Sequence, residues 1–203
     1  MAMLVLGLLL FLGVHSLRIV ADPWRTATIA RIGAMPWKAI YSVVSIVAFA
    51  MIVYGYGQAR MQIPLWSPPT WTKHLTALLM LPVFPMFLAA YIPRNAIKVR
   101  LGHPQILSVK LWALAHLVSN GNLADVLLFG AFLAWAIADF RAARLRDAKA
   151  MGSPHDPLWR APATQAPQLG ATVITVVAGL VVYVLFVVWL HAALIGVKPF
   201  GAS

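Results

Sequence analysis

Six long apolar stretches divide this 203-residue chain and decide what it can fold into. A bilayer core about 30 Å thick is crossed by about 20 helical residues, since each residue adds about 1.5 Å. The stretches that reach or approach this length lie near residues 2–20, 37–57, 74–92, 104–120, 122–141 and 170–196. The sequence therefore predicts an all-α, polytopic membrane helical bundle of about six transmembrane helices, with residues 1–203 forming a single transmembrane domain.

Composition agrees with a chain surrounded by lipid. Hydrophobic residues make up 62% of the sequence and charged residues 10%, against about 25% charged in soluble domains. The net charge of +11 would suggest nucleic-acid binding in a soluble protein. Here we interpret the basic residues as membrane-flanking groups that contact anionic lipid. We therefore expect the lipid bilayer to be the partner, and we expect no binding of nucleic acid.

Two features that the sequence lacks limit the kinds of site and segment that it can form. The chain has no cysteine, which excludes disulfides, thiolate metal sites and cysteine nucleophiles. The first apolar stretch lacks a basic leading region and a small-residue cleavage site, so we expect it to be a retained span.

Basic residues concentrate in alternate loops and predict the orientation. The first, third and fifth loops hold Arg18, Arg25, Arg31, Lys38, Arg94, Lys98, Arg100, Arg141, Arg144, Arg146, Lys149 and Arg160. Because basic loops stay on the cytoplasmic side, both termini of this multi-pass protein are expected to face the opposite side. Within the fifth loop, residues 141–149 are predicted to extend a helix, and residues 152–167 to be extended and mobile.

The segment from Gly102 to Asn122 combines apolar helix character with polar side chains. Pro104 is typical of a helix start, and Gly121 is expected to end the helix in the left-handed conformation. Between them, His116 shares one helix face with residues one turn away, including Asn120. A histidine inside a membrane-length helix is rare unless it points into the protein, so this segment is the first candidate for a functional site.

A second histidine, His15, lies in the first span at a depth similar to that of His116. Interhelical hydrogen bonding, a proton relay, a metal ligand and a haem axial ligand are the alternatives for both. A relay needs carboxylates, and the five acids all lie near span ends or in loops. A protein-built metal site needs several converging ligands, whereas haem needs only one or two histidines and an apolar slot. The positions of the two histidines are therefore compatible with haem binding but do not require it.

Other residues would complete such a site. Haem propionates are expected to meet either Arg18 or the pair Arg100 and His103, and Asn120 either caps its helix or binds a ligand. His74 and His191 lie near the outer interface, as a second ligand pair or, the reading we favour, as interfacial side chains.

Three motifs resemble the NnrU family of small bacterial membrane proteins. They are FLGVHSLR in the first span, GHPQ-x8-LAH-x3-NGN in the fourth, and LHAALIGVKPF near the end. The resemblance covers essentially the whole chain and implies an association with denitrification and nitric oxide metabolism. The plant 15-cis-zeta-carotene isomerase carries a related domain that binds haem b, with axial histidines in the motifs that match His15 and His116. It also has a cysteine where this chain has Ala113, which puts the isomerase mechanism in doubt here.

The resemblance and the residues together give three functional hypotheses. The first is a haem b protein, with His15 and His116 as iron ligands, that supports nitrogen-oxide metabolism or membrane redox sensing. The second is a haem-dependent cis–trans isomerase of an apolar polyene such as a carotenoid. The third is a membrane assembly factor without a cofactor.

Overall fold

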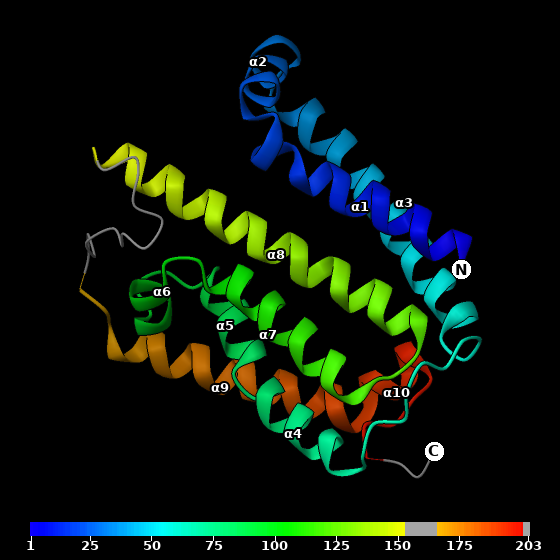
Figure 1. Ribbon diagram of the computed structural model, residues 1–203. Helices are drawn as coiled ribbons and strands as arrows, with labels where there is room; N and C mark the ends of the chain where they lie inside the picture. Colours follow the sequence, from blue (N-terminus) through cyan, green and yellow to red (C-terminus); the bar gives the residue numbers. More distant parts are fainter. Residues whose placement is uncertain (153–165, 201–203) are drawn as a thin grey trace. The chain divides into compact units, whose positions relative to one another are not determined.

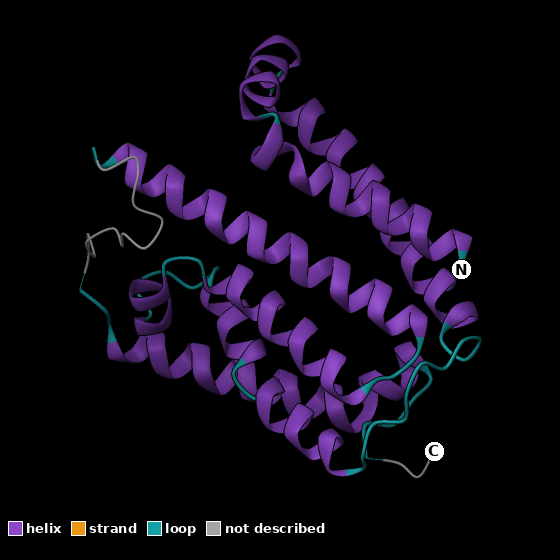
Figure 2. Cartoon of the chain, in the orientation of Figure 1, coloured by secondary structure: helices purple, strands orange, loops and turns teal. Residues whose placement is uncertain are grey.

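The computed structural model describes residues 1–152 and 166–200, which are almost entirely helical (Figures 1 and 2). The helices are α1 (Ala2–Val20), α2 (Asp22–Ile32), α3 (Ala34–Ala59), α4 (Trp71–Met80), α5 (Val83–Ala89), α6 (Ala96–Leu101), α7 (Pro104–Ser119), α8 (Leu123–Ala150), α9 (Leu169–Leu185), the π-helix η1 (Phe186–Leu190) and α10 (His191–Ile195). Most of the segment predicted to be extended, residues 152–167, lies outside the described residues.

Five helical segments are long and apolar enough to cross a membrane. They are Ala2–Val20, Ala34–Ala59, Trp71–Ala89, Leu123–Ala150 and Leu169–Ile195. Each falls on one of the predicted spans. The remaining predicted span corresponds to α7, which has 16 residues and is shorter than a bilayer core by this measure. The all-helical class is confirmed, and the described helices support a multi-pass membrane protein.

Local sequence features explain several helix boundaries. Helix α7 begins at Pro104 as predicted, and α8 continues to Ala150, which confirms the basic helical extension. The helical segment Trp71–Ala89 is interrupted between Met80 and Val83, where Pro82 cannot donate a backbone hydrogen bond. The prediction for Gly121 is wrong, because its φ is not positive. Its carbonyl instead accepts hydrogen bonds from the backbone N–H groups of Leu65 and Trp66.

Two helices lie in stretches where the sequence predicts loops. Helix α2 starts with Asp22 in its first turn and a proline at its first positions, which favour a helix N-terminus. Helix α6 is capped by Asn95, whose side chain accepts a hydrogen bond from the backbone N–H of Lys98. Both helices are short and more polar than the spans, so hydropathy alone does not reveal them.

The chain divides into two compact units, and unit 1 comprises Met1–Ser67 with Asn120–Trp135. In this unit α1 packs along α3 (Figure 1). Glycines make the close approach possible: a Cβ on Gly7 would lie 2.8 Å from the backbone nitrogen of Ile52, and a Cβ on Gly55 would overlap the backbone of Leu4. Helices this close gain dispersion contacts that larger residues would prevent.

Unit 2 comprises Pro68–Ser119 with Ala136–Ser203. In it α5 packs against both α7 and α9, and α4 packs against α7. Gly179 of α9 faces Pro85 of α5, where a Cβ would lie 2.5 Å from the proline nitrogen. The core of this unit includes Met80, Val83 and Ala115. Small residues at these contacts again set the distance between helices.

Candidate functional site

His15 lies in unit 1 among aromatic rings. Phe11, one turn earlier on α1, stacks on it with ring centroids 4.1 Å apart. The ring of Tyr41 lies 5.2 Å away, and Trp135 meets the imidazole edge-on at 6.1 Å. Phe11 in turn contacts Phe49 and Phe132. We call Phe11, Tyr41, Phe49, Phe132 and Trp135 the aromatic cage of His15.

His116 lies in unit 2, near the C-terminal end of α7. Its ring is 5.5 Å from that of Trp112, one turn earlier, and Trp112 packs against the core of the unit. The adjacent Ala115 is fully buried, and its carbonyl accepts a hydrogen bond from Thr76 of α4. Ala113, at the position where the plant isomerase has cysteine, is also fully buried. His116 therefore lies on a turn of α7 whose buried side packs against the core of unit 2.

The two histidines share one hydrogen-bond arrangement. The Nδ1 atom of His15 lies 2.6 Å from the carbonyl oxygen of Phe11, and the Nδ1 atom of His116 lies 2.8 Å from that of Trp112. A carbonyl oxygen can only accept, so Nδ1 carries the hydrogen in both rings. In a neutral imidazole the lone pair then lies on Nε2, the atom that would ligate a metal.

This donor chemistry fits haem better than a protein-built metal site. Among residues 1–152 and 166–200, no three or more histidine, aspartate or glutamate side chains come together as a metal-binding group. Haem iron takes four ligands from the porphyrin and needs only one or two side chains. Single, oriented histidines with Nε2 as the ligating atom, in apolar or aromatic surroundings, satisfy that requirement.

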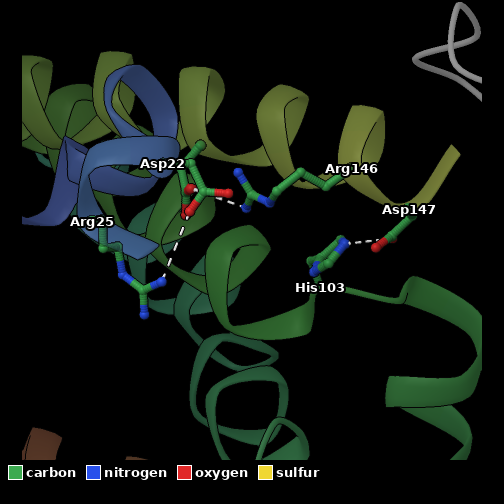
Figure 3. A network of polar contacts seen from close by, with 6 residues as sticks. Asp22, Arg25, His103, Arg146 and Asp147 are labelled. Carbon is green, nitrogen blue, oxygen red and sulfur yellow. Dashed lines mark hydrogen bonds and ion pairs between the residues drawn. The ribbon is translucent and has the colours of Figure 1, made fainter. Parts of the chain in front are cut away.

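His103 is engaged differently, as Figure 3 shows. Its Nε2 atom lies 2.8 Å from a carboxylate oxygen of Asp147, near the end of α8. Because the carboxylate accepts, Nε2 donates, and this ring links the start of α7 to the basic extension of α8. The ring also meets Phe140 edge-on at 6.2 Å. His103 is therefore suited to a supporting role and not to ligation through Nε2.

Two cations gather at the same phenylalanine. The ammonium of Lys110 lies 4.0 Å from the centre of the Phe140 ring, and the guanidinium carbon of Arg144 lies 5.9 Å from it. Arg144 is only 5% exposed and packs against Gly102, whose φ of +73° is one that glycine adopts without strain. Asp139, the residue before Phe140, lies 3.9 Å from Arg146.

The other predicted site residues lie at helix ends. Arg18 is exposed in the last turn of α1, and Arg100 is exposed in the last turn of α6. Asn120 follows α7 directly and is partly buried.

The two outer histidines make separate contacts within unit 2. His74 stacks on Phe200 with centroids 6.0 Å apart. His191 is half-buried, and its Nδ1 donates an exposed hydrogen bond to the carbonyl oxygen of Val197 at 2.6 Å. Within the described part of unit 2 no hydrogen bond or ring contact joins the two imidazoles, and their place at the outer interface stays a prediction.

Sequence reasoning missed the partners that surround the candidate residues. The spacing of Phe11 and His15 by four residues could have shown that they stack, since such residues share a helix face. Tyr41, Trp135 and Asp147 come from other helices, and only tertiary structure brings them to the histidines. No local pattern in the sequence reveals them.

Comparison with protein families assigns the chain. Residues 3–199 match the family model described as NnrU protein, which is nearly the whole sequence. No match was found among curated proteins or among solved structures. The matched region includes both histidine motifs and nearly all of the C-terminal motif. The chain therefore belongs to the NnrU family.

Proposed function

We propose that this protein binds haem b, which His15 and His116 would hold as the candidate iron ligands, and serves membrane redox sensing or nitrogen-oxide metabolism. The observation that carries the proposal is the hydrogen bond from Nδ1 to a backbone carbonyl at both histidines. The same arrangement commonly orients histidines that bind metals. Membership of the NnrU family supports the physiological setting.

The residues of the chain have definable tasks in this proposal. The carbonyl oxygens of Phe11 and Trp112 hold the two imidazole rings in place and make Nε2 more basic, which strengthens ligation. Apolar surroundings keep water away from the iron. Bound haem supplies one-electron redox chemistry. Arg18, Arg100 and His103 are the candidates to neutralise its propionates, and Asn120 is the candidate for a further hydrogen bond.

The proposal is tested by replacing each histidine in detergent-purified protein. The wild type is expected to give a pyridine haemochrome spectrum of haem b and a Soret band of six-coordinate, low-spin haem. His15→Ala and His116→Ala should each lose that coordination, because one axial ligand is removed, and the double variant should lose the haem. Added imidazole should restore the low-spin spectrum of each single variant.

His191→Ala is the matched control, because His191 makes the same kind of Nδ1–carbonyl hydrogen bond, but in an exposed position near the C-terminal end of the helical segment Leu169–Ile195. It is expected to keep the wild-type spectrum, as is His74→Ala. A wild-type protein without a Soret band would refute haem binding. A Soret band unchanged in both His15→Ala and His116→Ala would refute the ligand assignment.

The proposal includes an orientation, with both termini on the outer side of the bacterial inner membrane. The basic residues of the alternate loops support it. A phosphatase fused after Ser203 is therefore expected to be active, and a fluorescent protein fused there to remain dark. Fusions after Gly152 should behave in the opposite way. Fluorescence from the C-terminal fusion would show that the orientation is reversed.

A further inference from the structure

Two buried polar atoms in unit 1 lack any partner. They are the indole Nε1 of Trp135 and the hydroxyl oxygen of Ser45. Leaving a buried donor without a hydrogen bond costs about 1–3 kcal/mol, so nearly all such groups in proteins have a partner. A bound group is therefore a natural candidate for the missing acceptor.

Both atoms belong to helices that flank His15. Trp135 is itself part of the aromatic cage, and its ring meets the imidazole edge-on. Ser45 follows Tyr41, another cage residue, by four residues on α3, which places the two on one helix face. The unpartnered groups thus lie on the two helices that contribute cage residues opposite α1, where His15 is found.

The donor set indicates the chemistry of the missing partner. An indole N–H can only donate, and a serine hydroxyl can donate, so the partner must be an acceptor. Arg18, three residues after His15 on α1, adds a positive charge to the same end of the helix. Two neutral donors and a cation favour an anionic acceptor, and planar carboxylates match such a set well. The aromatic rings around them favour a flat, apolar body for the rest of the ligand.

We propose that the indole N–H of Trp135 donates a hydrogen bond to a carboxylate of the ligand bound at His15, with Ser45 as a second donor. The inference rests on the proposed function, under which that carboxylate is a haem propionate. It assigns Trp135 as a binding residue that neither motif spacing nor family membership identifies. Trp135 thereby selects ligands with a free carboxylate over ligands without one.

The experiment compares two proteins, wild type and a Trp135 variant, with two ligands that differ in their carboxylates. Trp135→Phe keeps an aromatic ring but removes the N–H donor. Haem-depleted wild type and variant are titrated in detergent with haemin and with haemin whose two propionates are methyl esters, and the Soret band reports binding. The substitution is expected to weaken haemin binding about tenfold, the worth of one charge-assisted hydrogen bond. It should weaken binding of the ester much less, because the ester has no charged acceptor.

Two further measurements exclude a merely structural role. In ultraviolet resonance Raman difference spectra between wild type and Trp135→Phe, the indole band that reports hydrogen bonding should shift when haemin binds and stay unshifted with the ester. Trp24→Phe, a change at a tryptophan that is 56% exposed on α2, should alter neither affinity nor spectrum. Ser45→Ala should weaken haemin binding in the same selective way, to a smaller degree.

The outcomes separate this inference from the proposed function. Equal weakening of haemin and ester binding by Trp135→Phe, or no weakening of either, would overturn the hydrogen bond while leaving haem binding intact. An indole band that is already shifted without any ligand would show that water is the acceptor and would also overturn it. A wild type that binds neither compound would refute the proposed function itself, which the absence of any Soret change would reveal.

Discussion

Gly55→Ala is expected to destabilise the protein by at least about 3 kcal/mol, the upper range for overpacking a core. A Cβ at this position would overlap the backbone nitrogen of Leu4 and lie 2.8 Å from its Cα. Leu4 is fully buried, and backbone atoms cannot move aside by a rotamer change as a side chain can. Relief therefore requires α1 to move away from α3, which gives up the dispersion contacts along the helix pair.

The same helix offers a matched control for this change. Gly57 lies two residues further along α3, and a Cβ there would meet no atom within 4 Å. Gly57→Ala should be neutral or slightly stabilising, because alanine favours helix more than glycine does. Thermal unfolding in detergent, followed by circular dichroism, should show a midpoint lower by on the order of 10 °C for Gly55→Ala alone. Equal midpoints for the two variants would contradict the close packing of α1 and α3.

The spans could be predicted because lipid imposes a simple requirement. In a bilayer core every backbone polar group must be satisfied within the segment, so length and hydropathy suffice to find helices such as α1 and α9. The start of α7 at Pro104 followed from the geometry of proline, and the break near Pro82 has the same cause. Helices α2 and α6 were not predicted because polar helices outside the bilayer core can bond to water, and so need neither a set length nor high hydropathy.

The turn at Gly121 shows why one prediction failed. Glycine at a helix end favours the left-handed conformation, and this local preference was the basis of the prediction. In the structure the turn instead pairs with the segment around Leu65, so its carbonyl accepts backbone hydrogen bonds from a distant part of the chain. A tertiary interaction replaced the local cap, and a local rule has no access to such a contact.

The candidate site was predictable only in part. His15 and His116 could be singled out because placing an imidazole inside a membrane costs free energy, and this cost can be inferred without a structure. What surrounds them was not predictable, since the cage of His15 takes Tyr41 from α3 and Trp135 from α8. The pairing of His103 with Asp147 likewise joins residues 44 positions apart. Candidate functional residues can be identified from the sequence, whereas the residues that surround them depend on how the helices pack.

Asp125→Ala is expected to be the second strongly destabilising change, at about 2–4 kcal/mol. Asp125 is 1% exposed and accepts three hydrogen bonds within unit 1. One carboxyl oxygen accepts from the hydroxyl of Tyr56 at 2.6 Å, and the other accepts from the backbone and side-chain N–H groups of Asn122 at 2.9 and 3.1 Å. The aspartate thus caps the start of α8, much as in a capping box, and ties that cap to α3.

The cost of this substitution comes mainly from the donors that it leaves behind. Alanine would leave the Tyr56 hydroxyl and the Asn122 N–H groups without their acceptor in poorly hydrated surroundings. Tyr56→Phe removes one donor together with its need for a partner, so alone it should cost only about 1 kcal/mol. For the same reason the double variant should be more stable than the sum of the two single changes predicts, which a double-mutant cycle measures.

Asp22→Ala is the control for the loss of a carboxylate as such. Asp22 makes an exposed ion pair with Arg25 at 3.8 Å, and pairs of this kind contribute at most about 1 kcal/mol. Thermal unfolding of the four variants in one detergent should therefore rank Asp125→Ala as the least stable single change, with Asp22→Ala close to wild type. Strict additivity of the Asp125 and Tyr56 changes would mean that the two side chains do not interact. In that case the backbone hydrogen bonds to Ile63, Leu65 and Trp66 would hold the turn at Asn122 without help from Tyr56.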